Sequence, residues 1–151
     1  MEQFQVEMTT LCEKLVAIML GSLCLTDTKW FKPKNECDQA QLILDVSGRR
    51  PSPGGNINGL QFYDDGMEWV DLEPVEGALI VNIGDLMQIV SNGRFKLVLH
   101  SVVANNTRHR ISKWFFYLPP WDDVVLPLKK LVEFDRLPMY RTVIWKEYVE
   151  F

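Results

Sequence analysis

The sequence is poor in the residues that build metal clusters and disulfide frameworks. Its 151 residues include two histidines and three cysteines, Cys12, Cys24 and Cys37, and no two cysteines form a CxxC pair. Structural zinc sites need closely spaced Cys and His ligands, whereas a disulfide scaffold needs a dense, even set of cysteines. The odd cysteine count therefore favours a reducing compartment, and we expect a cytosolic protein.

The chain also lacks a surplus of basic residues. It carries 16 Lys and Arg against 20 Asp and Glu, which gives a formal charge of -4. Because nucleic-acid binding usually leaves a basic stripe on the surface, we expect no nucleic-acid partner. One local cluster is basic, and a solvated hairpin end explains it as well as a binding role does. It consists of Arg108, His109, Arg110 and Lys113.

No apolar run is long enough to cross a membrane. Residues 15–25 (LVAIMLGSLCL) could be mistaken for the core of a signal peptide, but acidic residues surround the approach to them. They also fall short of the roughly 20 apolar residues that a membrane helix requires. We therefore expect a buried helix here and no membrane partner.

A single domain over residues 1–151 is expected, because 151 residues with 47% hydrophobic content suffice to bury one core. Apolar residues recur at steps of three and four along residues 3–20, which predicts an amphipathic helix. Gly21 is the residue expected to end it.

The remainder reads mainly as strands. Asp64-Asp65-Gly66 lies between two aromatic-containing pairs and predicts a hairpin turn. Asp85 and Gln88 are residue types of a helix N-cap and its capping box, and Gly93 would close this short helix. A further short helix is expected at residues 128–133. The expected strands are 41–46, 60–63, 78–83, and the pair 95–103 with 110–117.

Short strands joined by turns, with one long helix outside them, predict a mainly β fold with flanking helices. A jelly roll or a related double-sheet barrel satisfies this pattern. Within it, residues 47–59 (SGRRPSPGGNING) form a turn-rich interruption without periodicity. Residues 59–120 would then form the jelly-roll core, and residues 121–151 a C-terminal tail.

His100 is the first candidate for chemistry. A lone histidine in a strand is more often a packed or surface residue than a metal ligand. Arg110 follows ten residues later, however, and Ser112 two residues after that. A guanidinium can hold a carboxylate through two parallel hydrogen bonds, and a serine hydroxyl adds a third donor. A histidine on the adjacent strand could then bind an iron ion that the other end of a 2-oxo acid chelates.

Which side chain shares a face with His100 depends on the turn between the two strands. A two-residue loop, Asn105-Asn106, would place His109 on that face. A three-residue loop, 105–107, would place Arg110 there instead. Asn tolerates the left-handed conformation that the longer loop needs. The residues alone leave both loops open.

Residues 59–120, from GLQFYDDG to YLPP, resemble the C-terminal core of plant 2-oxoglutarate-dependent dioxygenases. MLGSLCLT, KWFKPK and the ending YRTVIWKEY are most similar to gibberellin 3-oxidases within that family. The resemblance implies a double-stranded β-helix, a jelly-roll variant. It also implies that the protein uses iron(II) and takes 2-oxoglutarate as co-substrate, with ascorbate supporting turnover. The implied substrate is a small diterpenoid acid such as a gibberellin, and we expect the protein to be a monomer.

The resemblance assigns roles to three residues. His100 falls on the distal iron ligand, while Arg110 and Ser112 fall on the pair that binds the far carboxylate of 2-oxoglutarate. It therefore favours the longer loop and leaves His109 on the outer face. No residue is assigned a catalytic role beyond these cofactor contacts.

The family's other two iron ligands come from an HxD motif that lies between a PxP turn and the GLQ segment. Here Pro51-Ser52-Pro53 is followed within a few residues by Gly59-Leu60-Gln61, and the sequence contains no HxD. About twenty residues, enough for two typical strands, are missing relative to the family. We therefore expect an incomplete jelly roll with open strand edges.

The residues that could replace the missing ligands are few. Asp45 and Ser47 stand where the family has asparagine and tyrosine, and Asp45 is a weak candidate ligand. Asp85 is better explained as a helix N-cap, and Asp64 and Asp65 as turn residues. Two hypotheses follow. The chain is either an oxygenase of this family or a truncated relative that binds 2-oxoglutarate or a partner without turnover.

Overall fold

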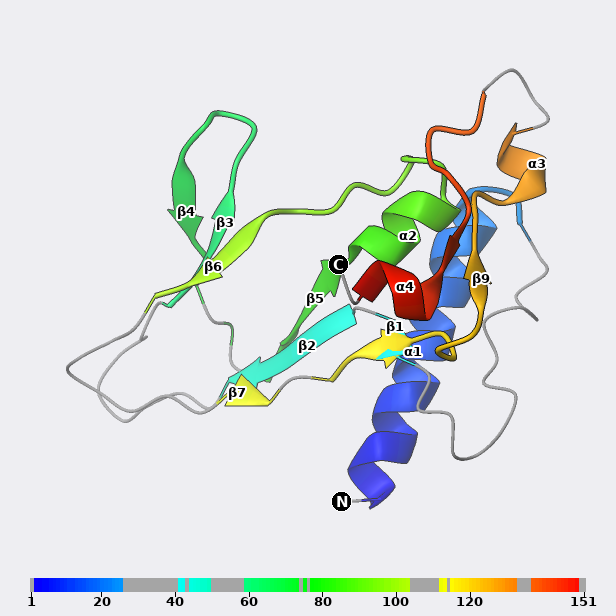
Figure 1. Cartoon of the computed structure of the whole chain (residues 1–151). Coiled ribbons are helices and arrows are strands. Elements are labelled where there is room, and N and C mark those ends of the chain that lie inside the picture. Colours follow the sequence, from blue (N-terminus) through cyan, green and yellow to red (C-terminus); the bar gives the residue numbers. More distant parts are fainter. Residues whose placement is uncertain are drawn as a thin grey trace, which may run out of the picture.

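The structure is a computed structural model that describes residues 2–25, 41–42, 44–49, 59–73, 75, 77–103, 112–113, 115–132 and 137–149. Of residue 2 and of the strand residues 41–49 and 112–113, it describes the backbone only. Figure 1 shows strands reaching to one side of the molecule and helices gathered on the other.

Helix α1 spans Glu2–Ser22 and confirms the predicted helix over residues 3–20. Its buried residues recur every four positions, which is the spacing of one helical face. The prediction for Gly21 is wrong, because the helix continues through it. The left-handed residue is Cys24, with φ 59°, after which the Leu25 N–H donates to the Leu20 carbonyl at 3.0 Å. The buried residues of this face are Met8, Cys12, Val16 and Leu20.

Two antiparallel sheets of three strands each form the side of the molecule opposite the helices. One sheet has the order β5-β2-β7 and the other β4-β3-β6. In chain order the strands are β2 Leu44–Arg49, β3 Leu60–Tyr63, β4 Trp69–Asp71, β5 Leu79–Ile83, β6 His100–Val102 and β7 Ser112–Lys113.

Four shorter strands pair in twos. β1, Gln41–Leu42, lies parallel to β8, Tyr117–Leu118. β9, Val124–Val125, lies antiparallel to β10, Val143–Ile144. The β9–β10 pair joins two segments of the predicted C-terminal tail.

The predicted strands at 60–63 and 78–83 are confirmed, as is the hairpin in which Tyr63 pairs with Trp69. The predicted strand 41–46 corresponds to β1 and β2. Since β2 continues to Arg49, the turn-rich run 47–59 begins later than predicted, and residues 50–58 lie outside the described part. The predicted strand 95–103 is strand only over His100–Val102.

The described part of the chain has three further, short helices: α2 Asp85–Val90, α3 Lys129–Val132 and α4 Trp145–Val149. α2 and α3 were predicted, but the N-cap of α2 is Gly84 and not Asp85, and no side chain caps it. Gly93 does follow α2 with φ +77°, in the conformation that glycine adopts most readily. Helix α1 alone contributes 21 residues, so helices form a larger share than the mainly β prediction suggests.

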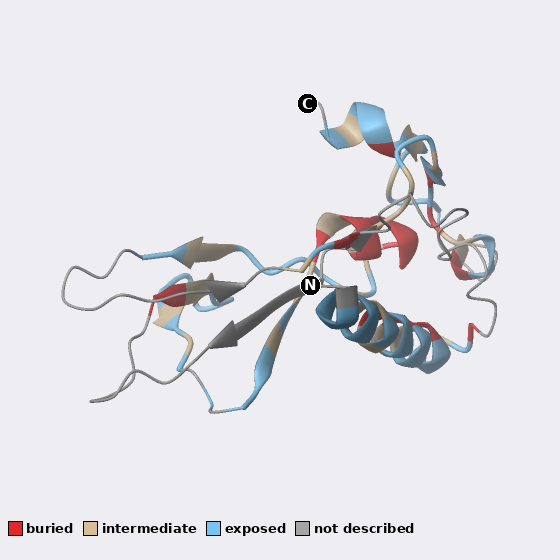
Figure 2. Cartoon of the chain, turned by 90° about the horizontal axis from the view of Figure 1, so that it is seen from below, coloured by how far each residue is buried: buried red, intermediate tan, exposed pale blue. Residues whose placement is uncertain are grey.

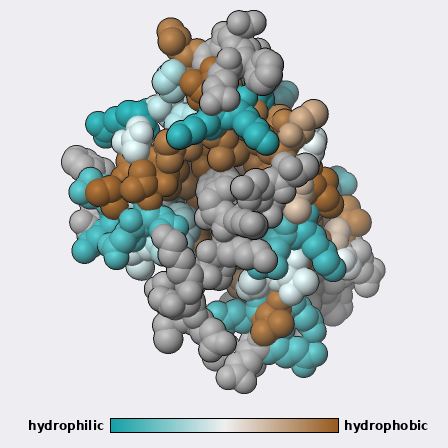
Figure 3. Space-filling model, turned by 90° about the vertical axis from the view of Figure 1, so that its right-hand side faces the viewer, coloured by the Kyte–Doolittle hydropathy of each residue, from teal (hydrophilic) through white to brown (hydrophobic). Residues whose placement is uncertain are grey.

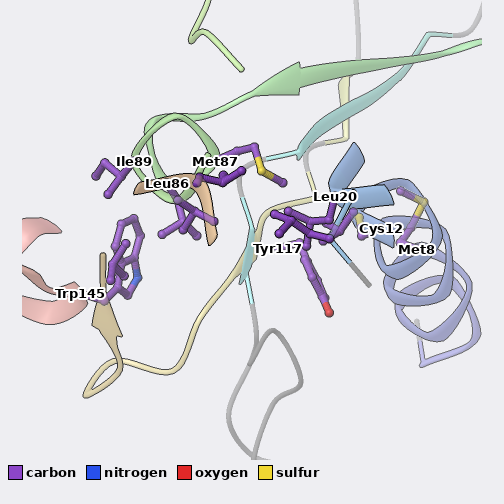
Figure 4. Close-up of a cluster of buried hydrophobic side chains, with 13 residues drawn as sticks. Met8, Cys12, Leu20, Leu86, Met87, Ile89, Tyr117 and Trp145 are labelled. Atoms are coloured by element: carbon purple, nitrogen blue, oxygen red, sulfur yellow. The ribbon is translucent and has the colours of Figure 1, made fainter. Parts of the chain in front are cut away.

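The described core lies among the helices and not between the two sheets. The side chains that form it come from α1, α2, β8, β9, α3 and α4 (Figures 2 and 4). Tyr117, Leu86 and Trp145 are each no more than 2% exposed. By contrast, Leu79 and Val81 of β5 are 45% and 40% exposed. None of the described helices is both long and apolar enough to span a bilayer.

Candidate functional site

His100 begins β6, one of the two outer strands of the sheet β4-β3-β6, and lies opposite Phe62 of β3. Leu60 lies opposite Val102 in the same ladder. Residues directly opposite one another, and residues two apart on a strand, share a face of the sheet. His100 is therefore the one polar member of an apolar group on this face, together with Leu60, Phe62 and Val102.

The imidazole of His100 has one ring nitrogen near a backbone acceptor. Nδ1 lies 3.3 Å from the carbonyl oxygen of Val98. Because a carbonyl only accepts, this contact favours the tautomer with its proton on Nδ1. Nε2 then keeps its lone pair, which is the form of imidazole that binds metals.

Gln88 holds the segment that leads into β6. Its side-chain Oε1 accepts a hydrogen bond from the Leu97 N–H at 2.7 Å, three residues before His100. The sequence pattern predicted Gln88 as the capping-box partner of Asp85 instead. No local pattern predicts the observed contact, because it joins a helix to an extended segment nine residues away.

Ser112 begins β7, where it pairs with Arg49 of β2 in the other sheet. Arg110 and His109 lie outside the described residues. The predicted pairing of the strand containing His100 with the strand containing Ser112 is wrong, since β6 pairs with β3 and β7 with β2. The two candidate residues therefore belong to different sheets, and the loop-length argument for adjacent strands does not apply.

Of the candidate acidic ligands, Asp85 has other partners for its carboxyl group. The Oδ1 of Asp85 accepts the Leu86 N–H at 2.8 Å, and its carboxyl group also hydrogen-bonds the hydroxyl of Tyr148. Asp64 forms the β3–β4 turn, in which its carbonyl accepts the Met67 N–H at 2.9 Å. Asp45 lies in β2 opposite Asn82, and its side chain is outside the described part.

The described residues do not complete an iron site. Among them, no three His, Cys, Asp or Glu side chains lie close enough together to hold a metal ion. Iron(II) oxygenases of this class use two imidazoles and one carboxylate on one face of the metal. The described part of the chain offers one such ligand, His100.

Comparison with known proteins identifies the family. Residues 50–119 match the family described as the 2OG-Fe(II) oxygenase superfamily. The chain is 33% identical over 170 residues to gibberellin 3-beta-dioxygenase 1 of Pisum sativum, covering 97% of this chain and 46% of that protein. It is 36% identical over 172 residues to jasmonate-induced oxygenase 4 of Arabidopsis thaliana, covering 97% and 48%. The chain thus spans about half the length of these curated relatives.

Two solved structures share the fold. A crystal structure of JOX2 in complex with 2OG, Fe and JA superposes with a TM-score of 0.81 at 27% identity, covering 99% of this chain and 50% of that chain. A dioxygenase for auxin oxidation from rice superposes with a TM-score of 0.63 at 31% identity, covering 73% and 36%.

The alignment with the Pisum sativum protein is longer than the matched part of this chain. It runs over 170 positions, whereas 97% of 151 residues is only about 146, so about 24 positions of the relative have no counterpart here. The family match, the identities and the superposition agree, and the chain belongs to the 2OG-Fe(II) oxygenase superfamily.

Proposed function

We propose that this chain is the iron- and 2-oxoglutarate-binding part of an oxygenase that hydroxylates a gibberellin-like diterpenoid acid. The observation that carries the proposal is the match to gibberellin 3-beta-dioxygenases along 97% of the chain. The superposition with an oxygenase crystallised with 2OG, Fe and a small substrate supports the same class of chemistry. The core would be a jelly roll with its two walls drawn from the two observed sheets, which add β2 to residues 59–120.

Three residues carry the proposed binding. His100 would ligate iron through Nε2, which the contact of Nδ1 with Val98 leaves available. Arg110 and Ser112 would bind the far carboxylate of 2-oxoglutarate, Ser112 from the sheet β5-β2-β7. When bound, iron couples substrate oxidation to decarboxylation of 2-oxoglutarate. The described residues supply one of the three expected ligands, so we derive no step of oxygen activation from them.

The remaining features of the proposal concern the setting. We propose a plant protein of the cytosol, acting as a monomer in gibberellin metabolism, with ascorbate supporting turnover. The free cysteines Cys12 and Cys24 suit a reducing compartment. Since the relatives' names cover gibberellins and jasmonate, the substrate class is better supported than the individual substrate.

Activity is tested with purified protein, iron(II), 2-oxoglutarate, ascorbate and a gibberellin precursor. Mass spectrometry should detect succinate and a product that is heavier by one oxygen atom. Arg110→Ala should abolish both, whereas Arg94→Ala, an exposed arginine of the turn after α2, should not. Absence of both products from folded, iron-loaded protein would rule out oxygenase activity.

A chain that binds 2-oxoglutarate without turnover is the competing outcome, motivated by the missing HxD motif. Calorimetry separates the two. Binding of 2-oxoglutarate that strengthens strongly with iron and weakens in His100→Ala supports the oxygenase. Binding that is indifferent to iron and lost in Arg110→Ala supports the non-catalytic chain. The relatives named above are enzymes, which favours the first outcome.

A further inference from the structure

A cavity of about 390 Å³ lies among the C-terminal elements, on the side of the molecule that carries α3 and β9 and away from β6 (Figure 1). Its volume falls in the range of small-molecule sites, roughly 300–1,000 Å³. His100, the candidate iron ligand that the structure describes, does not line it. In Figure 3, which shows this side of the molecule, hydrophobic residues form a band between hydrophilic ones.

The walls of this cavity are held in place by the core. Leu126 and Thr142, which line it, directly adjoin Val125 and Val143, a pair in the β9–β10 ladder. Lys129 and Val132 line it from α3, whose Leu131 is only 3% exposed. The β9–β10 pair and the packed helix α3 therefore hold the lining residues of the cavity in place.

The two segments that line the cavity, one before and one after the end of α3, are also hydrogen-bonded to residues at the end of α2. The Leu128 N–H donates to the carbonyl of Val90 at 3.1 Å. On the other side, the Oδ1 of Asn92 accepts the Met139 N–H at 2.8 Å, and its Nδ2 donates to the Leu137 carbonyl at 3.4 Å. Because these hydrogen bonds form the pocket before a ligand binds, less free energy is lost in ordering its walls on binding.

The lining has an apolar part and a cationic part. Leu126, Pro127, Val132 and Pro138 provide hydrocarbon surface. Lys129 and Arg141 provide two positive charges, and Tyr140 and Thr142 provide hydroxyl groups. Among the residues the structure describes, no Asp or Glu lines the cavity. Lys129 and Arg141 are exposed and can pair with an anionic group of a ligand. An anion with no hydrocarbon body would leave the apolar part in water.

We propose that this cavity binds an amphipathic organic anion, a monocarboxylic acid with an aliphatic or alicyclic body. Its carboxylate pairs with Arg141 and Lys129, since guanidinium groups bind carboxylates through two parallel hydrogen bonds. Its hydrocarbon body lies against Leu126 and Val132. The site is separate from the proposed oxygenase site and does not depend on iron.

Octanoate is a suitable probe, with octanol and octylamine as matched ligands that change only the head group. Titration followed by the methyl resonances of Leu126 and Val132 should give saturable binding of octanoate, about tenfold tighter than that of octanol. Arg141→Ala and Lys129→Ala should each weaken binding about tenfold. Lys14→Ala, which removes an exposed lysine of α1, should leave binding unchanged.

Two further measurements keep the test specific. Thr142→Trp, which fills the cavity while keeping both cations, should abolish binding of octanoate. An excess of 2-oxoglutarate should not displace octanoate, so the result is independent of the proposed oxygenase function. Equal binding of octanol, or unchanged affinity in Arg141→Ala or Thr142→Trp, would overturn the proposal.

Discussion

The side-chain oxygen of Asn92 accepts a hydrogen bond from the N–H of Met139 at 2.8 Å, although the two residues are 47 positions apart. Asn92 is 1% exposed and has a left-handed backbone, with φ 52°. It therefore joins the end of α2 to the segment that leads to β10. Asparagine suits this position for two reasons: it tolerates the left-handed conformation, and its side chain offers both a hydrogen-bond acceptor and a donor.

Replacing Asn92 should measure these two contributions separately. Asn92→Ala loses the hydrogen bonds and keeps an unfavourable φ, so the free energy of unfolding should fall by about 2–4 kcal/mol. Asn92→Gly loses the same bonds but suits the conformation, and should be roughly 1 kcal/mol less damaging. Urea unfolding of both variants measures the difference. Equal losses would show that the backbone conformation contributes nothing.

Two glycines should respond to alanine with opposite signs. At Gly93, φ is +77° and an added Cβ would lie 3.3 Å from the Sδ of Met139, so Gly93→Ala should destabilise by about 1–2 kcal/mol. At Gly21, inside α1, an added Cβ would meet nothing within 4 Å. Gly21→Ala should therefore stabilise by about 0.5–1 kcal/mol. Thermal unfolding of the pair checks the signs, and a destabilised Gly21→Ala would contradict the helical assignment there.

The two faces of α1 should differ strongly in their sensitivity to truncation. Leu20 is fully buried, and Leu20→Ala should cost about 2–5 kcal/mol of unfolding free energy. Ile18, two residues earlier, is 69% exposed, and Ile18→Ala should change stability by less than about 0.5 kcal/mol. Chemical denaturation measures both. Similar losses at the two positions would mean that Ile18 is covered in solution.

Stability should fall at high pH because of two tyrosines. Burial, assisted by the charge of Glu13 and by Cys12, raises the pKa of Tyr117 to about 12. Burial and the carboxyl of Asp85 raise the pKa of Tyr148 to about 12. The ordinary value is 10.0, so the folded protein holds these protons more tightly than the unfolded chain. The stabilisation is complete below pH 10 and is lost as the pH rises toward 12.

Unfolding measured at pH steps from 8 to 12 should show this decline, beginning near pH 9. The early onset comes from Cys12, because burial raises the pKa of its thiol from 9.0 to about 11. Tyr117→Phe and Tyr148→Phe should each make the curve less steep above pH 10. If neither variant changes how steeply the free energy of unfolding falls with pH, the tyrosines are not the source of that fall.

Much of the local structure could be predicted from the residues. The stripe on α1, the Asp64-Asp65-Gly66 turn and the β5 strand depend on neighbours within a few positions, and all three are confirmed. The N-cap prediction for Asp85 was wrong by one position, because α2 begins at Asp85 and Gly84 is its N-cap. The carboxyl of Asp85 accepts the Leu86 N–H and also contacts Tyr148, more than sixty residues away along the chain. Likewise, Gly21 was only one of several residues that could follow α1, and the turn placed Cys24 in the left-handed conformation.

The sequence by itself determined the family, the candidate residues His100, Arg110 and Ser112, and the absence of an HxD motif, because these depend only on residue type and order. Tertiary structure alone decided that β6 and β7 enter different sheets, that the described core lies among the helices, and that the C-terminal segments line an open cationic cavity. The reason is physical. Strand pairing and packing are set by contacts between distant segments, whose free energies no local pattern encodes.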